Sequence, residues 1–284
     1  MPALSRKATR THENGSVPTE FRLLWRGRCS VRACARSRRR WLGRSFRLGP
    51  PAGRRADGRP WIALTAMAIA TSSIRLGALV TPVPRRHVAK LAREVSTLDQ
   101  LSSGRVVFGA GAGYAALPDY SAFGDTGTPA ERAAALDEAL AVLDQLWSGS
   151  PVEHDGPHCR VSTTGFTPTV QRPRVPIWTA ATKSAVKPLT RAARWDGMIC
   201  ADTYGLEIEP ADLKVMVEKV RAVRDSDAPL DVIRFGRTDN PEDVAVVEAC
   251  AEAGATWWME YTFPQITDIE GTRKRVRKRP PRIG

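Results

Sequence analysis

The amino-acid sequence predicts an α/β fold in which strands and helices alternate, and three observations lead to this prediction. From Pro60 onwards, short apolar segments rich in β-branched residues alternate with longer amphipathic segments. Gly and Pro recur between these segments, where elements end. Hydrophobic residues make up 42% of the chain, which is enough for a sizeable core. This alternation is typical of a parallel sheet covered by helices, either closed into a barrel or open and doubly wound.

The first half of this region shows clear helix and strand patterns. Pro60 lies in the first turn of a predicted helix, where proline is favoured. Val88, Leu91 and Val95 recur at intervals of three and four, which predicts an amphipathic helix that ends at the Ser-Ser-Gly segment 102–104. The predicted order is helix 60–70, strand 73–81, helix 84–101, strand 105–113 and helix 129–147.

The second half begins with an irregular region, in which Asp155-Gly156 predicts a short hairpin. Regular alternation then resumes, and Gly254 is placed to end the last long helix. Alternation within the final strand puts Trp257 and Met259 on one face and Trp258 and Glu260 on the other. The predicted order is strand 175–181, helix 187–194, strand 197–201, helix 210–224, strand 230–235, helix 241–253 and strand 255–260.

Charge divides the chain at about Pro60. Residues 1–59 hold 16 of the 43 basic residues and three of the 30 acidic ones, so they account for the whole net charge of +13. This segment is rich in arginine and has no hydrophobic period, so we interpret it as disordered or aberrant, with a basic arm that binds nucleic acid non-specifically as the alternative. The body of the chain carries an ordinary charge, and no specific nucleic-acid partner is expected.

Cysteine usage and hydropathy indicate a cytoplasmic protein. The five cysteines are scattered and form no CxxC pair, which favours free thiols over a disulfide framework or a zinc knuckle. No apolar run reaches the length of about 20 residues that spans a bilayer. We therefore expect no membrane partner.

Several segments resemble the luciferase-like family of flavin-dependent oxidoreductases, which includes monooxygenases and enzymes that use the deazaflavin coenzyme F420. The resemblance extends in the family's order over nearly all of residues 60–284. It rests on IRLGALVTPVPRRHVAKLAREVSTLDQLSSGRVVFGAGAG (74–113), FGD (123–125), RAAALDEALAVLDQLWSG (132–149), VQRPRVPIWTAA (170–181), RAARWDGMI (191–199) and AEAGATWWMEYTFP (251–264).

The resemblance implies a (β/α)8 barrel whose active site lies at the carboxyl ends of the strands. The recognisable strands then correspond to barrel strands three to eight. The first strand, helix and second strand are missing or replaced, and residues 1–59 stand in their place. We expect two regions: 1–59, and an incomplete barrel domain over 60–284.

The resemblance also implies FMN or coenzyme F420 as cofactor and a small organic molecule as substrate. A flavin ring is flat and largely apolar, so it needs a wall that it can approach closely. Gly109, Gly111 and Gly113 end one strand without side chains and suit this contact, although without the family resemblance tight strand–helix packing is the better explanation of them. Val80 and Thr81 end the preceding strand, where the family often has a non-proline cis peptide behind the ring. A homodimer is left open.

A second group of candidates follows the strand 175–181. Its amides and hydroxyls suit a phosphate at a helix N-terminus, or else form an ordinary polar helix cap. These cofactor candidates are Thr179, Ala180, Ala181, Thr182 and Ser184. Relatives usually have Gly-Gly where this chain has Ala180-Ala181. Tyr114 and Tyr120 are candidates for the substrate pocket, and Glu260 is a weak catalytic candidate.

The histidines give no clear catalytic group. The family often places a catalytic His or acid on the second strand or in the loop after it, and this chain has no matching residue, which leaves the catalytic residue unknown. His87 is expected at the surface. His154, His158 and Cys159 are close in sequence, but because no carboxylate accompanies them we expect no metal site. Two functions follow: a flavin- or deazaflavin-dependent oxidoreductase or monooxygenase, or an inactive barrel fragment.

Overall fold

The computed structural model describes residues 60–113, 120–124, 127–202, 207–260, 274–278 and 281. The predicted segment 1–59 and the candidate Tyr114 lie outside these residues. Within the described residues, no helix combines the length and the apolar character that crossing a membrane requires.

The described part of the chain forms a six-stranded parallel sheet in the order β1-β2-β5-β6-β7-β8. Each strand therefore pairs with the next parallel strand along the chain. A doubly wound sheet reverses its strand order at a switch point, so this order favours the barrel architecture. The strands are β1 (Thr81–Pro82), β2 (Phe108–Gly111), β5 (Ile177–Thr182), β6 (Gly197–Ala201), β7 (Asp231–Gly236) and β8 (Trp257–Glu260).

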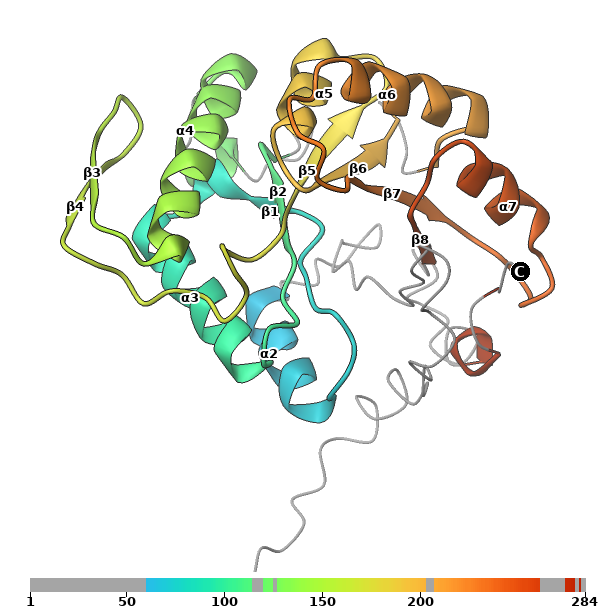
Figure 1. Ribbon diagram of the computed structural model, residues 1–284, viewed down its shortest axis with the longest axis horizontal. Coiled ribbons are helices and arrows are strands. Elements are labelled where there is room, and N and C mark those ends of the chain that lie inside the picture. Colours follow the sequence, from blue (N-terminus) through green and yellow to red (C-terminus); the bar gives the residue numbers. More distant parts are fainter. Residues whose placement is uncertain are drawn as a thin grey trace, which may run out of the picture.

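Helices follow one another around the outside of this sheet (Figure 1). Successive helices contact each other, and their apolar faces pack on the outward side chains of the strands. Trp147, for example, is fully buried and donates a hydrogen bond to the carbonyl of Ala92 at 3.1 Å. The helices are α2 (Pro60–Ala70), α3 (Val88–Leu101), α4 (Pro129–Ser148), α5 (Val186–Ala193), α6 (Pro210–Ala222) and α7 (Ala245–Glu252).

The strand predicted over 73–81 is interrupted. Its start pairs with the neighbouring segment through a single bridge between Leu76 and Val106, and its end pairs Thr81 with Ala110. Five residue steps lead from Leu76 to Thr81, whereas four lead from Val106 to Ala110, and this mismatch is the mark of a bulge. The extra residue breaks the ladder, so only Thr81–Pro82 remains as β1.

Two predicted helix starts were too early. Pro84 lies in a short 3-10 turn, η2 (Val83–Arg85), and α3 begins at Val88 after the exposed N-cap residue His87. Before α7, the Asp243 carboxylate accepts hydrogen bonds from the backbone amides of residues 239 and 240, so a side-chain-capped turn precedes the helix. The positive φ of 105° at Gly254 confirms the predicted helix end.

The predicted hairpin is confirmed. Strands β3 (Val152–Asp155) and β4 (Arg160–Thr163) pair antiparallel and form a separate two-stranded sheet. The hairpin extends beside α4, away from the six-stranded sheet (Figure 1).

Candidate functional site

The carboxyl ends of β1, β2 and β5 lie side by side, as the family resemblance implied. Thr81 pairs with Ala110, which pairs in turn with Thr179. One residue further along, Pro82 pairs with Gly111. A Cβ atom added to Gly111 would lie 2.7 Å from Val80 Cγ2 and 3.8 Å from Ala180 Cβ. The structure therefore brings Gly109, Gly111, Val80 and the β5 candidates to one place.

Alternation along the strands divides these candidates between two faces. Trp178 and Ile199 pack in an apolar cluster on the inner face, with Leu79 and Val80 against it. Alternation then puts four of the candidates on the inner face as well: Gly109, Gly111, Ala180 and Thr182.

The remaining strand candidates point the other way. Ala110 and Ala181 pack in the clusters formed with the surrounding helices. Thr81 and Thr179 lie in the same row as Ala110, so they share this outer face. Both threonine side chains are buried, and their hydroxyl oxygens have no hydrogen-bond partner among the described residues. Their hydroxyls therefore do not face the space enclosed by the strands.

Two tryptophans cover the inner face near the amino-terminal ends of β5 and β8, hereafter its lower part. The rings of Trp178 and Trp257 have centroids 5.3 Å apart. Their indole nitrogens donate to the two oxygens of one carboxylate, Asp231, at 3.2 and 2.7 Å. A Cβ at Gly197 would lie 2.3 Å from the Trp178 ring, so this glycine makes room for it. Asp231 thus fixes both rings as an apolar floor.

Above this floor, the residues near β1, β2 and β5 are small. Gly111 and Ala180 share one row with Ile199 and Ile233, so the side chains in this row become larger from β2 to β7. Leu79, Val80, Ala180 and Thr182 are all partly exposed although they face inward. The peptide bond between Leu79 and Val80 is cis, as the family resemblance implied for this region. The result is an apolar shelf, hereafter the shelf, in which Leu79, Val80 and Ala180 are partly exposed and the buried Gly109 and Gly111 lie beneath the side chains of Leu79 and Val80.

Gly113 and Tyr120 lie together beyond the end of β2. Gly113 has a φ of 82°, and an added Cβ would lie 2.5 Å from the Tyr120 hydroxyl. That hydroxyl donates to the carbonyl of Ala112 at 2.5 Å. The guanidinium groups of Arg85 and Arg132 lie 5.4 and 4.6 Å from the centroid of the tyrosine ring. Tyr120 is therefore buried in a cationic setting.

The segment after β5 offers less to a phosphate than the sequence suggested. Helix α5 begins at Val186, and its N-cap residue, Ala185, makes no side-chain capping bond. The Lys183 ammonium is held by the carboxylates of Asp212 at 2.9 Å and Asp202 at 3.0 Å, which raise its pKa. Ser184 is exposed just before the helix.

Glu260 lies on the outer face, in the same alternation as Trp258. Its carboxylate accepts hydrogen bonds from the Thr238 amide at 2.6 Å, the Thr238 hydroxyl at 2.9 Å and the Trp258 indole at 2.9 Å. Arg275 forms an ion pair with it at 3.2 Å. These donors occupy both oxygens and join the end of β8 to the segment after β7. These contacts are structural, because they hold two segments of the fold together.

Sequence reasoning missed the residues that shape the floor. Asp231 and Gly197 read as ordinary strand starts, and nothing local indicated that one would hold two indoles and the other would receive Trp178. It also missed Glu138 on α4, which the fold brings to His154 and Cys159.

Comparisons with known proteins agree with this geometry. The solved structures of coenzyme F420 dependent tetrahydromethanopterin reductase from Methanopyrus kandleri and monooxygenase RslO1 from Streptomyces bottropensis match with TM-scores of 0.59 and 0.61, each at 18% identity. They cover 83% and 78% of this chain, and the chain covers 89% and 80% of theirs. These likenesses establish the fold as part of a (β/α)8 barrel.

Sequence relatives are more similar but match over shorter lengths. An F420-dependent hydroxymycolic acid dehydrogenase of Mycobacterium tuberculosis is 36% identical over 142 residues, which is 49% of this chain and 38% of the relative. An F420-dependent glucose-6-phosphate dehydrogenase of Beutenbergia cavernae is 32% identical over 206 residues, 69% of this chain and 58% of the relative. The chain thus matches between about two fifths and three fifths of the length of these relatives. Residues 41–266 match the luciferase-like monooxygenase family, so the chain belongs to that family.

Proposed function

We propose that this chain is an oxidoreductase that binds a flavin or deazaflavin, F420 or FMN, against the shelf. The observation that carries the proposal is the partly exposed apolar surface at the carboxyl ends of β1, β2 and β5, above a floor of two fixed tryptophans. Family membership supports it, since the matched relatives include two F420-dependent dehydrogenases. Parallel barrels place their active sites at this end of the strands.

The residues present fit a flat tricyclic ring. Ala180 projects little into the enclosed space, and Gly111 lets the Val80 side chain lie close to β2, so a ring is able to approach the strands there. Leu79 and Val80 offer partly exposed apolar side chains beside them. A cofactor that covers these side chains removes apolar surface from water, which stabilises the complex by about 25 cal/mol per Å².

The bound group supplies the redox chemistry, which is transfer of a hydride or activation of oxygen. The chain's own residues bind and orient it. Asp231 keeps Trp178 and Trp257 in place beneath the shelf, and these rings exclude water from the lower interior. Tyr120 and the guanidiniums of Arg85 and Arg132 form a cationic rim at the end of β2. This rim suits an anionic part of the cofactor or of the substrate.

Cofactor titration of the purified chain tests the proposal. F420 and FMN are added separately, and the change in their intrinsic fluorescence and absorption gives the dissociation constants. We expect saturable binding of one of them. Assays with that bound cofactor, with and without oxygen, then distinguish a dehydrogenase from a monooxygenase. The absence of saturable binding to either would refute the proposal.

A substitution at the shelf makes the test specific. In Gly111→Val, a side chain would begin 2.7 Å from Val80 and displace it from its place over β2, which changes the shelf surface, so binding should weaken by at least tenfold. Gly165→Val is the matched control, because an added Cβ there has no heavy atom within 4 Å among the described residues. Thermal unfolding of both variants separates lost binding from lost folding. Equal affinity in the two variants would place the cofactor elsewhere.

A further inference from the structure

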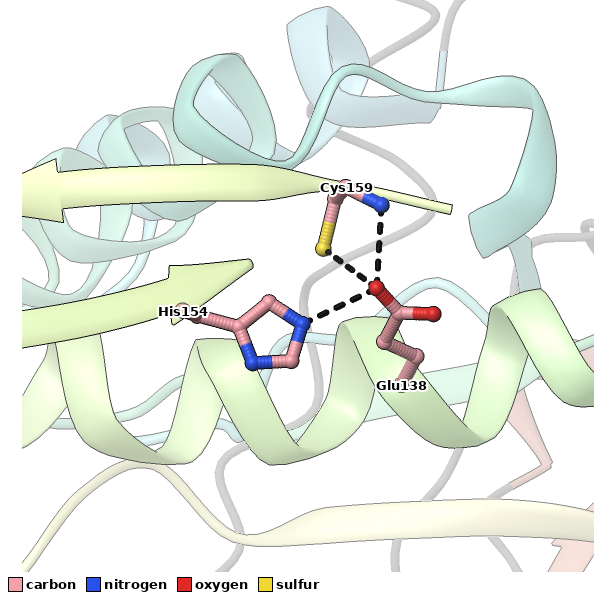
Figure 2. Close-up of side chains that lie close together, drawn as sticks. All are labelled: Glu138, His154 and Cys159. Atoms are coloured by element: carbon pink, nitrogen blue, oxygen red, sulfur yellow. Dashed lines mark hydrogen bonds and ion pairs between the residues drawn. The ribbon is translucent and has the colours of Figure 1, made fainter. Parts of the chain in front are cut away.

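Three potential metal ligands from separate elements converge at the hairpin, outside the barrel interior. Glu138 comes from α4, His154 from β3, and Cys159 from the turn before β4 (Figure 2). One ligand atom from each lies within 4.8 Å of the other two. All three side chains are partly buried. The group unites a carboxylate, an imidazole and a thiol, which is a set of donors that zinc accepts.

The contacts within the group are close to those that a metal would need. The carboxylate oxygen Oε1 of Glu138 lies 2.9 Å from His154 Nε2 and 3.4 Å from Cys159 Sγ. Ligand atoms bound tetrahedrally at about 2.0–2.3 Å from zinc lie roughly 3.3–3.8 Å from one another. Shifts of a few tenths of an ångström to about one ångström would therefore open the group around a cation.

We propose that Glu138, His154 and Cys159 bind a Zn²⁺ ion, with the fourth position open to water. In the structure, the His154 ring and the Cys159 thiol both contact one carboxylate oxygen of Glu138 (Figure 2). A divalent cation would take the place of the hydrogens in these two contacts. The Cys159 thiol loses its proton to solvent as the sulfur–zinc bond forms. His154 binds the ion through an unprotonated Nε2, so its one ring hydrogen moves from Nε2 to Nδ1 by exchange with solvent. One thiolate and one carboxylate then balance the two charges of the ion.

The surroundings support a neutral, ordered site. The nearest guanidinium on the hairpin, Arg160, is already paired with Asp155 through two hydrogen bonds of 2.7 and 2.9 Å. The backbone amides of His158 and Cys159 donate to the Glu138 carboxylate at 3.0–3.2 Å. The carboxylate is therefore oriented before any ion binds. The donor set favours zinc over magnesium or calcium, which prefer oxygen ligands alone.

This site would tie the hairpin to the outside of the barrel. It holds β3 and the turn before β4 against α4 through ligands 16 and 21 residues apart from Glu138. A metal that binds only the folded arrangement stabilises it in proportion to its occupancy. The site is independent of the cofactor proposal, because no shelf residue takes part in it.

Metal content of the full chain tests the proposal. The protein is stripped with EDTA under reducing conditions, incubated with equimolar ZnCl2, desalted and analysed by mass spectrometry of the metal. We expect about one zinc per chain and a higher melting temperature than that of the stripped protein. CoCl2 in place of zinc should give a thiolate-to-cobalt charge-transfer band in the near ultraviolet. An absence of retained metal would overturn the proposal.

Variants assign the ligands. Cys159→Ser preserves a donor to Glu138, so it should fold, but it should lose the cobalt band and bind zinc at least about 100-fold more weakly. Glu138→Gln and His154→Gln should also weaken binding, and circular dichroism will show whether they fold. Glu153→Gln, on the other face of β3, should bind normally. A double variant, Cys29→Ser with Cys34→Ser, controls for the thiols outside the described residues. Zinc retained in Cys159→Ser but lost in this double variant would also refute the assignment.

Discussion

Arg105 anchors the C-terminal end of α2, and replacing it with methionine should destabilise the fold strongly. Its guanidinium donates five hydrogen bonds. Four are directed at backbone carbonyls, those of Ala68, Thr71, Ile74 and Ser102, at 2.6–3.1 Å, and the fifth reaches the Thr71 hydroxyl at 3.0 Å. Two of these carbonyls lie at the end of α2, where the helix dipole favours a cation.

The size of the effect follows from these contacts. A hydrogen bond from a charged donor contributes about 1.5–3 kcal/mol, but the five act as a unit and are not additive. Methionine keeps the apolar stem and leaves the carbonyls without a donor. We expect the free energy of unfolding to fall by about 3–4 kcal/mol. For a domain of this size, the melting temperature should fall by roughly 6–16 °C.

Urea denaturation followed by circular dichroism measures this loss. Arg160→Met is the matched control, because Arg160 also forms a bidentate contact, with Asp155, but both side chains are largely exposed. An exposed ion pair contributes about 0–1 kcal/mol. If Arg105→Met cost no more than Arg160→Met, the stabilisation assigned to these partly buried carbonyl contacts would be wrong.

Four further predictions concern α4 and the hairpin. Thr128→Ala removes one half of the capping box of α4 and should cost about 1 kcal/mol in urea unfolding; an unchanged midpoint would contradict this. Hydrogen bonds from Thr128 lower the pKa of Glu131. The stability that the Glu131 carboxylate contributes is therefore fully present above the ordinary pKa of glutamate and is lost as the pH falls through the lowered pKa, and Glu131→Gln should abolish this pH dependence. Leu143→Ala, at a fully buried position, should cost about 2–5 kcal/mol, and a cost under about 1 kcal/mol would mean that α4 packs differently. Burial, with the carboxylate of Glu138 beside it, raises the pKa of Cys159 to about 11. In metal-free protein at pH 8, iodoacetamide should therefore label Cys159 far more slowly in the native state than in urea, with the rate rising towards pH 11; equal rates, measured by peptide mass spectrometry, would refute this.

Hydrophobic patterning was enough to predict the helices and strands around the six-stranded sheet, apart from the interruption before β1. The 3.6-residue period of α3 and α4 and the apolar runs of β5 to β8 are local properties of the chain, so the order of strands and helices follows from them. Helix starts were less certain, because the 3-10 turn at Pro84 and the Asp243 turn compete with the helix in ways that composition does not reveal.

The tertiary structure decided which candidate residues share a site. The family resemblance predicted that the ends of β1, β2 and β5 would meet, because parallel strands in a barrel present their carboxyl ends together. It did not predict that Thr81 and Thr179 face the helices while Gly111 and Ala180 face inward, since the face of each residue depends on register and on the bulge before β1. Nor did it reveal that Glu138 meets His154 and Cys159, because a helix and a hairpin come together only through packing. Periodicity is fixed by neighbours along the chain, whereas a site is fixed by residues that are distant in the chain and adjacent only in the fold.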